Sequence, residues 1–491
     1  MAASIPITDQ LSNAESIRHQ LEADATAEAG ELFLRLVADY FAATAREEMP
    51  VSAPPSVPEL IRRFAEPLPL QGKPLEAIAE RLAREVIPDS NHLTHPMYLG
   101  HQVSAPLPAA VWTESLISAL NNSVAVREMS PAATAIEHQV IHWMTDLLGF
   151  GPDAGGTLTS GGTEATFTAL LAARAAVLPD SWQRGVGASP PVLVCGEHAH
   201  YAVSRAAGEL GLGLDHVAAI PSRNYRMDTG ALAARLGELR QSGTPVMAVV
   251  ATAGSTATGS FDDLAAIGRL CDEYGLWLHV DAAHGASALL SARHRERVRG
   301  IERARSVAWD PHKMMLLPLS AGMVLVRSER DLEAAYAQRA PYLFHGGDEY
   351  VWDQGVRSFA CSRRTDVIKL WVALQRYGAD GIGALYDYLC DLAEALYHRI
   401  EAHSQFVALH APESNILCFR WVGTRPQGDV ELDRINLELR QRYNATGAGW
   451  ITTTVLEGVR VLRVTIMNPR TTEAHLDRLL DGLSQVAAGL R

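Results

Sequence analysis

The sequence predicts an α/β protein with a mostly parallel central sheet, an N-terminal helical segment and a small C-terminal α+β domain. Between residues 91 and 364, short unbroken apolar runs alternate with longer stretches of helical periodicity. This alternation is typical of strands that are buried on both faces of a parallel sheet. After residue 365, a long helical stretch precedes a strand-like run and a final helix, which indicates a separate, smaller unit.

Residues 1–90 predict a helical segment followed by a proline-rich linker. Apolar residues recur at helical spacing between about Asn13 and Arg46, which indicates one or two amphipathic helices. The stretch Met49–Pro58 is expected to be extended, because proline removes a backbone donor and fixes φ. The predicted domains are therefore residues 1–90, 91–364 and 365–491.

The strands expected in the central sheet are apolar runs bounded by turn residues. They are Pro191–Cys195, Val246–Ala251, Leu276–Val280, Ser306–Trp309 and Gly322–Arg327. In the C-terminal region we expect a strand over Gly458–Thr465. Helices are expected to begin near Thr365 and near Thr472.

The composition argues against several classes of protein. A formal net charge of -13 disfavours a nucleic-acid binder, which normally has a basic face. The first residues lack the basic and apolar regions of a signal peptide, and no apolar stretch approaches the length of a membrane span. The five cysteines show no CxxC spacing. We expect a cytoplasmic protein without a nucleic-acid partner, a membrane segment or a metal site.

Lys313 and Asp281 are the most informative pair of residues in the chain, and each stands at the end of an apolar β-like run. An amine that attacks an aldehyde must be free base part of the time, and burial in an apolar pocket is expected to lower the pKa of Lys313. A buried carboxylate at Asp281 would favour a protonated pyridine nitrogen, which makes the ring an electron acceptor. The pair predicts a pyridoxal 5'-phosphate site. The alternative is a surface lysine and a structural aspartate.

The segment Gly155–Thr166 predicts a cradle for the phosphate of that cofactor. Its glycines let backbone amides approach an anion, and Thr163 adds a hydroxyl group. The helix that follows supplies free N–H groups and the positive end of its dipole. A plain turn with an N-cap is the alternative.

Two histidines, His198 and His200, follow the expected strand Pro191–Cys195. Ligands of open α/β sheets bind beyond the carboxyl ends of the strands, so a ring placed here could stack on a flat cofactor. A metal site is the alternative, but no Cys or acidic cluster at suitable spacing completes one. For His198, a structural hydrogen bond explains the residue equally well.

From about His95 to Leu483, the chain resembles the group II pyridoxal-phosphate-dependent amino-acid decarboxylases, which include glutamate, aromatic-amino-acid, histidine and 2,4-diaminobutyrate decarboxylases. The matching stretches are His95–Tyr98, Ser130–Glu137, Thr159–Ala165, Glu197–Tyr201, Val250–Thr256, His279–Ala283 and Asp310–Lys313. The resemblance implies the fold-type-I PLP-dependent transferase fold and a homodimer with active sites at the interface. It also implies decarboxylation of an L-amino acid to the amine and carbon dioxide through aldimine and quinonoid intermediates.

Positions in the matching stretches imply roles for individual residues. Lys313 would be the Schiff-base lysine, Asp281 the partner of the pyridinium and His200 the stacking ring. The residues implied near the phosphate and the cofactor face are Gly162, Thr163, His312 and Thr252.

The glycine-containing segment Tyr342–Gly355 is expected to be a loop. In the family, a loop here offers a tyrosine that reprotonates the substrate carbon. Tyr350 matches the spacing of glutamate decarboxylases, and Tyr342 matches that of aromatic decarboxylases. A loop aromatic packed on the core is the alternative for either.

Departures from the family's patterns concern the substrate. Position 284 is His, where glutamate decarboxylases tend to have Trp or Ser and aromatic decarboxylases Tyr. His101 and Gln102 fall where the family lines its side-chain pocket, and Arg127 stands in a region that meets the neighbouring active site. These residues suggest a substrate with a polar or acidic side chain, although Arg127 could equally form a surface ion pair. Two further candidates for holding a carboxylate, which could also be structural ion pairs, are Arg363 and Arg463.

Other reactions on the same fold are a carbon–carbon lyase, an aminotransferase or decarboxylation coupled to oxidative deamination. A tyrosine-to-phenylalanine change in the loop would indicate the last of these, and both tyrosines are present. A catalytically silent homologue that binds pyridoxal phosphate would have lost Lys313 or Asp281, and both are intact. The sequence therefore predicts a lyase of amino-acid metabolism.

Overall fold

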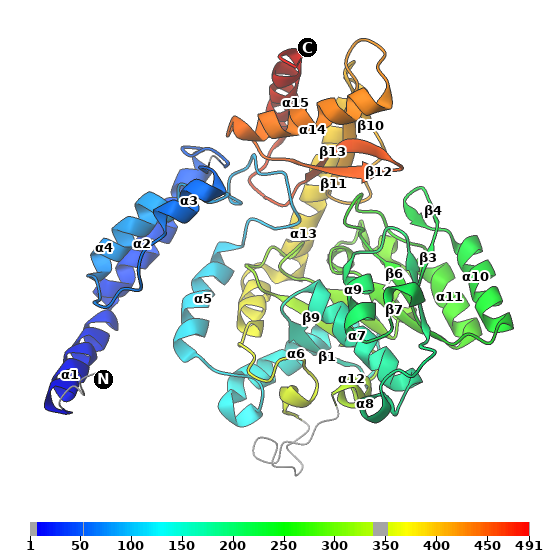
Figure 1. Ribbon diagram of the computed structural model, residues 1–491, viewed down its shortest axis with the longest axis horizontal. Coiled ribbons are helices and arrows are strands. Elements are labelled where there is room, and N and C mark those ends of the chain that lie inside the picture. The colour runs from blue at the N-terminus through cyan, green and yellow to red at the C-terminus, as the bar shows by residue number, and fades with distance from the viewer. Residues whose placement is uncertain (1–6, 53, 337–351, 491) are drawn as a thin grey trace, which may run out of the picture.

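The computed structural model describes residues 7–52, 54–336 and 352–490 (Figure 1). Its centre is a 7-stranded sheet with the strand order β1-β9-β8-β7-β6-β2-β3. Neighbouring strands from β3 to β8 pair in parallel, and β9 pairs antiparallel with both β8 and β1. The predicted mostly parallel sheet is therefore confirmed.

The expected runs all form strands of this sheet. Their bounds are β2 (Val192–Gly196), β6 (Val246–Thr252), β7 (Trp277–Asp281), β8 (Ser306–Trp309) and β9 (Gly322–Val326). Two strands lie outside the prediction, β1 (Gly155–Thr159) and β3 (Val217–Ile220). β1 has no apolar run, because it is built from Gly, Thr and one Leu, whereas β3 is a short apolar run, Val-Ala-Ala-Ile, at a partly exposed edge of the sheet.

Helices cover the sheet and its edges. Helix α7 (Gly162–Val177) packs across β6 to β9, so its first turn reaches the carboxyl ends of the central strands. The other elements of this region are α5 (Pro108–Leu120), α6 (Pro131–Leu147), α8 (Ser181–Arg184), α9 (Ala202–Glu209), β4 (Ser222–Arg223), β5 (Arg226–Met227), α10 (Thr229–Gln241), α11 (Leu264–Tyr274) and α12 (Arg330–Ala335).

The C-terminal region is a smaller α+β unit, as predicted. Its 4-stranded antiparallel sheet has the order β10-β11-β13-β12. The elements are α13 (Val367–Glu401), β10 (Phe406–Ala408), β11 (Ile416–Trp421), α14 (Asp429–Ala445), β12 (Thr452–Leu456), β13 (Val459–Thr465) and α15 (Glu473–Ala488). Thr472 and His475 form a capping box at α15, which explains why the helix begins there. The exact domain boundaries stay a prediction.

The N-terminal segment lies to one side of the body, with α1 extending away from it (Figure 1). Its helices are α1 (Ile7–Asp24), α2 (Ala27–Ala45), α3 (Val57–Arg63) and α4 (Leu75–Arg81). The expectation that the linker is extended through Pro58 is wrong at its end, because α3 begins at Val57. Proline is tolerated in the first helical turn, where its missing N–H would have no partner in any case.

Candidate active site

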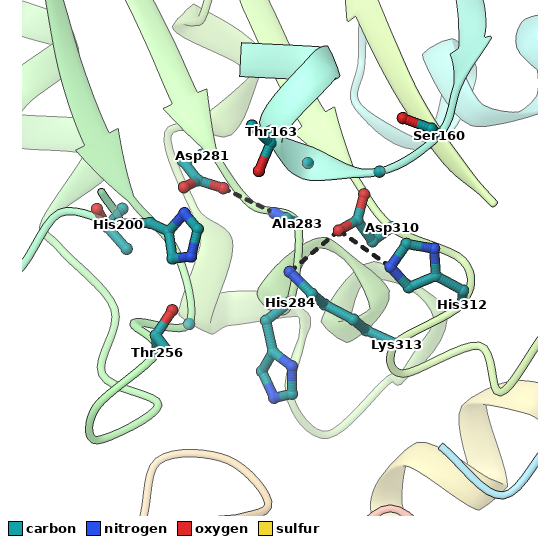
Figure 2. Close-up of a pocket in the computed structure, with 14 residues that line it drawn as sticks. Ser160, Thr163, His200, Thr256, Asp281, Ala283, His284, Asp310, His312 and Lys313 are labelled. Carbon is teal, nitrogen blue, oxygen red and sulfur yellow. Dashed lines mark hydrogen bonds and ion pairs between the residues drawn. The ribbon is translucent and has the colours of Figure 1, made fainter. Parts of the chain in front are cut away.

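A cavity of about 280 Å³ lies where the carboxyl ends of β6, β7 and β8 meet the first turn of α7 (Figure 2). This is the edge of a parallel sheet where ligands are expected. The cavity is lined by Ser160, Gly161, Gly162, Thr163, His200, Thr252, Gly254, Thr256, Asp281, Ala283, His284, Asp310, His312 and Lys313. The structure thus brings together every predicted cofactor-binding residue, together with His284.

Asp281 and His200 face the same part of the cavity (Figure 2). Asp281 ends β7 beside Thr252 on β6, is 8% exposed, and accepts a hydrogen bond from the backbone N–H of Ala283 at 3.2 Å. The Nδ1 atom of His200 accepts a hydrogen bond from the N–H of Ala202, which fixes the ring. Burial lowers the pKa of His200, so the imidazole is neutral and presents a flat face.

The first turn of α7 has the properties of an anion site. No side chain in the described part of the chain caps it, so its N–H groups are left for a ligand. A Cβ atom at Gly162 would lie 2.9 Å from the Cβ of Ala283 and 3.0 Å from an oxygen of Asp310, so only glycine fits this close approach. Thr163 extends from the same turn into the cavity (Figure 2).

Lys313 is paired with Asp310, a residue to which the sequence assigned no role. Its Nζ atom lies 3.0 Å from Oδ2 of Asp310, and His312 Nε2 lies 3.4 Å from the same oxygen. Nδ1 of His312 accepts the N–H of Ala321, so its Nε2 carries the proton that faces Asp310.

The predicted lowering of the pKa of Lys313 is wrong. Burial does act in that direction, but the negative charges of Asp310 and Asp281 outweigh it, and the pKa of Lys313 is raised. Conversely, burial would raise the pKa of Asp310, but Lys313 and His312 bring it down to about 2. Asp310 could have been found in the sequence, since it follows β8 directly and stands three residues before Lys313.

The residues of the cavity fit pyridoxal phosphate. The uncapped helix start and Thr163 suit the phosphate, Asp281 suits a protonated ring nitrogen, and His200 offers a face for stacking. Lys313 supplies an amine for the aldehyde carbon. Among the described residues, no group of three or more His, Cys, Asp or Glu side chains could hold a metal ion.

The remaining predicted substrate residues lie outside the lining of this cavity. His101 packs against the ring of Trp450, with ring centroids 4.9 Å apart. The Nε2 atom of Gln102 is buried and has no hydrogen-bond partner in the residues that the structure describes. The backbone N–H of Arg127 donates to Asp353 at 2.9 Å.

The two candidate arginines differ. Arg363 forms a buried two-point ion pair with Glu137, with N–O distances of 2.6 and 3.0 Å, so it is structural. Arg463 is 6% exposed and donates to the carbonyl oxygen of Ala257 at 3.1 Å. Its Nη2 atom is buried without a partner, and Arg463 forms no ion pair with a carboxylate, in both cases within the ranges the structure covers.

The remaining predictions concern His198 and the two tyrosines Tyr342 and Tyr350. His198 contacts Ser222, with Nε2 3.0 Å from Oγ, which supports the structural explanation for this residue. Tyr342 and Tyr350 lie outside the described residues.

Comparison with known proteins identifies the chemistry of this fold. The model of the pyridoxal-dependent decarboxylase conserved domain matches residues 58–422. An L-2,4-diaminobutyrate decarboxylase of Rhizobium meliloti (strain 1021) is 34% identical over 433 residues, which is 87% of this chain and 84% of the relative.

Solved structures of other proteins have a similar fold over almost the whole of this chain. Mouse CSAD in its apo form is 28% identical, has a TM-score of 0.88, and is matched over 94% of this chain and 99% of its own. The glutamate decarboxylase domain of a diaminobutyrate-pyruvate transaminase and L-2,4-diaminobutyrate decarboxylase from Vibrio parahaemolyticus is 26% identical. Its TM-score is 0.84, with 94% of this chain and 96% of that chain covered.

No helix in the described ranges is long and apolar enough to cross a membrane.

Proposed function

The chain belongs to the pyridoxal-dependent decarboxylase family, and we propose that it acts on an L-amino acid with a polar side chain. It is a pyridoxal-phosphate-dependent enzyme that converts an amino acid to the corresponding amine and carbon dioxide. The observation that supports these residues as its active site is the meeting of Lys313, Asp281 and the uncapped start of α7 in one cavity.

We assign the cofactor-holding roles to residues of this cavity. Lys313 attaches the cofactor, Asp281 keeps its ring nitrogen protonated, and His200 stacks on its ring. The residues proposed to hold the phosphate and the adjacent face are Gly162, Thr163, His312 and Thr252. When bound, pyridoxal phosphate accepts the electron pair left by the departing carboxylate.

Arg463 is proposed to hold the α-carboxylate of the substrate. It is a buried cation whose pKa is lowered by burial, and it forms no ion pair with a carboxylate among the described residues. An arginine offers two parallel N–H donors to a carboxylate. By fixing that group, Arg463 would select which bond of the α-carbon is broken, which is how proteins choose among the reactions open to this cofactor.

A tyrosine of residues 342–355 is proposed to return a proton to the α-carbon. Tyr350 and Tyr342 are the candidates, from the family spacings. Replacing each by Phe removes only the phenolic hydroxyl that would donate the proton. The acting residue's variant should therefore retain carbon dioxide release but form amine more slowly and yield aldehyde or ketone by-products. Product analysis of the two single variants distinguishes the candidates, because only one should show this partitioning.

Two substrate classes have support. The buried Nε2 donor of Gln102, which has no partner among the described residues, favours a polar or acidic side chain. The identity of 34% to an L-2,4-diaminobutyrate decarboxylase favours a diamino acid. His101 and Arg127 are proposed to contact the side chain, Arg127 from the neighbouring subunit.

We further propose a cytoplasmic homodimer. The N-terminal segment exposes large apolar side chains in the single chain, including Leu21 (63% exposed), Leu68 (82%) and Leu70 (93%). Apolar surface of this kind is stabilised when a partner covers it. A twofold-symmetric dimer is the commonest closed assembly.

The test is to offer the purified protein, with pyridoxal phosphate, a panel of acidic, diamino and aromatic L-amino acids and to identify the products by mass. Release of carbon dioxide with the matching amine from one class supports the proposal. Turnover confined to aromatic amino acids would contradict the polar pocket.

Sedimentation of the protein at assay concentration tests the proposed assembly, and an active monomer would contradict the dimer.

A further inference from the structure

His284 is held by a residue of the C-terminal unit. It follows β7, and its ring points away from Asp281 (Figure 2). There its Nε2 atom lies 2.7 Å from Oδ1 of Asn415, the residue directly before β11. His284 is 3% exposed and Asn415 is fully buried, so water does not compete for this contact.

The orientation of the Asn415 amide is fixed by a second contact. Its Nδ2 group donates to the carbonyl oxygen of Ile466 at 2.9 Å, and its backbone carbonyl accepts the N–H of Ile466, also at 2.9 Å. A flipped amide would place two oxygens against each other, so Oδ1 must face His284. An amide oxygen only accepts hydrogen bonds. Nε2 of His284 therefore carries the proton, and Nδ1 carries a lone pair.

The lone pair on Nδ1 of His284 has no hydrogen-bond donor among the described residues. The atom itself is buried. A buried acceptor without a hydrogen-bond donor destabilises the protein, so a donor from a ligand is favoured at this position. The ring is neutral, because burial first and the charge of Lys313 second lower the pKa of His284 to about 3.

The surroundings of His284 indicate what fills this position. The charged groups that act on its ring are Lys313, Arg463 and Asp310. An amino acid whose α-carboxylate binds Arg463, as proposed above, must bring its amino group to Lys313, and both of these cations act on the ring of His284. A positively charged N–H donor gains a strong hydrogen bond from a neutral imidazole nitrogen.

We propose that His284 Nδ1 accepts a hydrogen bond from the α-ammonium group of the substrate, and that Asn415 is a positioning residue that keeps His284 in the tautomer able to do so. The proposal rests on the function proposed above, because it takes the cavity to be the substrate site. It assigns a role to Asn415, which the sequence analysis did not single out.

The test compares ligands with and without an amino group. In Asn415→Leu, the acceptor for Nε2–H is lost and the tautomer is no longer fixed. KM for the amino acid should rise roughly tenfold or more, as expected for loss of one hydrogen bond to a charged group. The inhibition constant of the matching carboxylic acid without the amino group should change less than about threefold, because only the α-ammonium contact is lost.

Asn436 provides a matched control in the same small domain. It is fully buried, its Oδ1 accepts the N–H of Trp421 at 2.9 Å, and its Nδ2 donates to Trp421 and Leu432. Asn436→Leu should therefore lower stability as Asn415→Leu does but leave KM unchanged. If Asn415→Leu weakens both ligands equally, or if Asn436→Leu raises KM as much, the positioning role is wrong.

The tautomer can be measured without turnover. In cofactor-free protein with ¹⁵N-labelled histidine, His284 should show a protonated Nε2 and a lone-pair Nδ1, with His284→Gln identifying the signals. A proton on Nδ1 in the unmodified protein would overturn the proposal even if Asn415→Leu fails to fold. If no amino acid in the panel is decarboxylated, the proposed function fails, whereas the NMR result still decides the role of Asn415.

Discussion

The two sides of the active site balance their charges in different ways. On the large-sheet side, the carboxylate of Asp310 lies within 3.0 Å of Lys313 and 3.4 Å of His312, so its charge is compensated within the chain. On the small-sheet side, Arg463 is buried and meets only carbonyl and hydroxyl oxygens among the described residues. A buried cation without a counter-ion is costly. The chain thus compensates the charge of Asp310 by itself, whereas the charge of Arg463 is the one that the substrate carboxylate is proposed to compensate.

The same contrast separates the two buried arginines. Arg363 is 9% exposed and Arg463 6%, so burial alone does not distinguish them. Arg363 has the carboxylate of Glu137 at 2.6 Å, whereas Arg463 has none in the described ranges. A paired buried arginine contributes to the integrity of the fold, and an unpaired one is available to a ligand. This difference can be tested with matched substitutions.

The largest expected effect is that of Lys313→Ala on the cofactor side. Without the amine, the protein should lose covalent attachment of pyridoxal phosphate, and turnover should fall at least about a thousandfold, since both attachment and proton transfer at Nζ are removed. Borohydride reduction of the unmodified protein followed by peptide mapping should place the pyridoxyl group on Lys313. A label on another lysine would disprove the assignment. Lys369, which is buried and paired with Glu114 and Asp366, serves as the internal control.

Arg463→Met and Arg363→Met should have opposite phenotypes. Arg463→Met removes the proposed carboxylate contact, so kcat/KM should fall roughly 10- to 100-fold, the loss expected for about 1.5–3 kcal/mol of charged hydrogen bonding. Its stability should change little, because no acidic partner in the described structure is left unpaired. Arg363→Met leaves the buried carboxylate of Glu137 without its cationic partner and should destabilise the protein by about 3–5 kcal/mol.

Denaturant unfolding and steady-state kinetics of both variants check this pair of expectations. Equal losses of stability would show that Arg463 is structural too. A double variant, Arg363→Met with Glu137→Leu, should recover much of the stability lost in Arg363→Met, because replacing both members of a buried pair by apolar groups is far less costly than removing one.

The sequence predicted the cofactor side more completely than the substrate side. Lys313, Asp281 and His200 follow strands whose apolar runs are visible in the chain, so their convergence at one sheet edge could be expected from the parallel topology. The strands β1, β11 and β12 were not expected, and β11 carries Asn415 to its position next to His284. That contact joins residues 131 positions apart in the chain, so no local sequence pattern predicts it.

The direction of the pKa shift of Lys313 and the ion-pair partners of the two arginines could not be predicted from the sequence either. Burial of Lys313 was expected to lower its pKa, but the sign depends on how close Asp310 and Asp281 come, which only the folded chain determines. Likewise, nothing in the spacing of Arg363 and Arg463 shows which of them meets a carboxylate. The sequence therefore identified the residue types of the site, and the structure determined which charges are compensated.

The smallest expected effect concerns Asp310 and the protonation of Lys313. In cofactor-free protein, the amine must be free base to react with the aldehyde, so the rate of pyridoxal phosphate attachment should rise with pH through the raised pKa of Lys313. Asp310→Asn removes the nearest negative charge, and burial then lowers the pKa of Lys313 with less opposition. The midpoint of the pH–rate profile, measured by absorbance after rapid mixing, should move to lower pH. Asp263→Asn, which alters only the N-cap of α11, should leave the midpoint in place. An unchanged midpoint in Asp310→Asn would mean that Asp310 does not control the charge of Lys313, and the internal compensation inferred for the cofactor side would have to be assigned to Asp281.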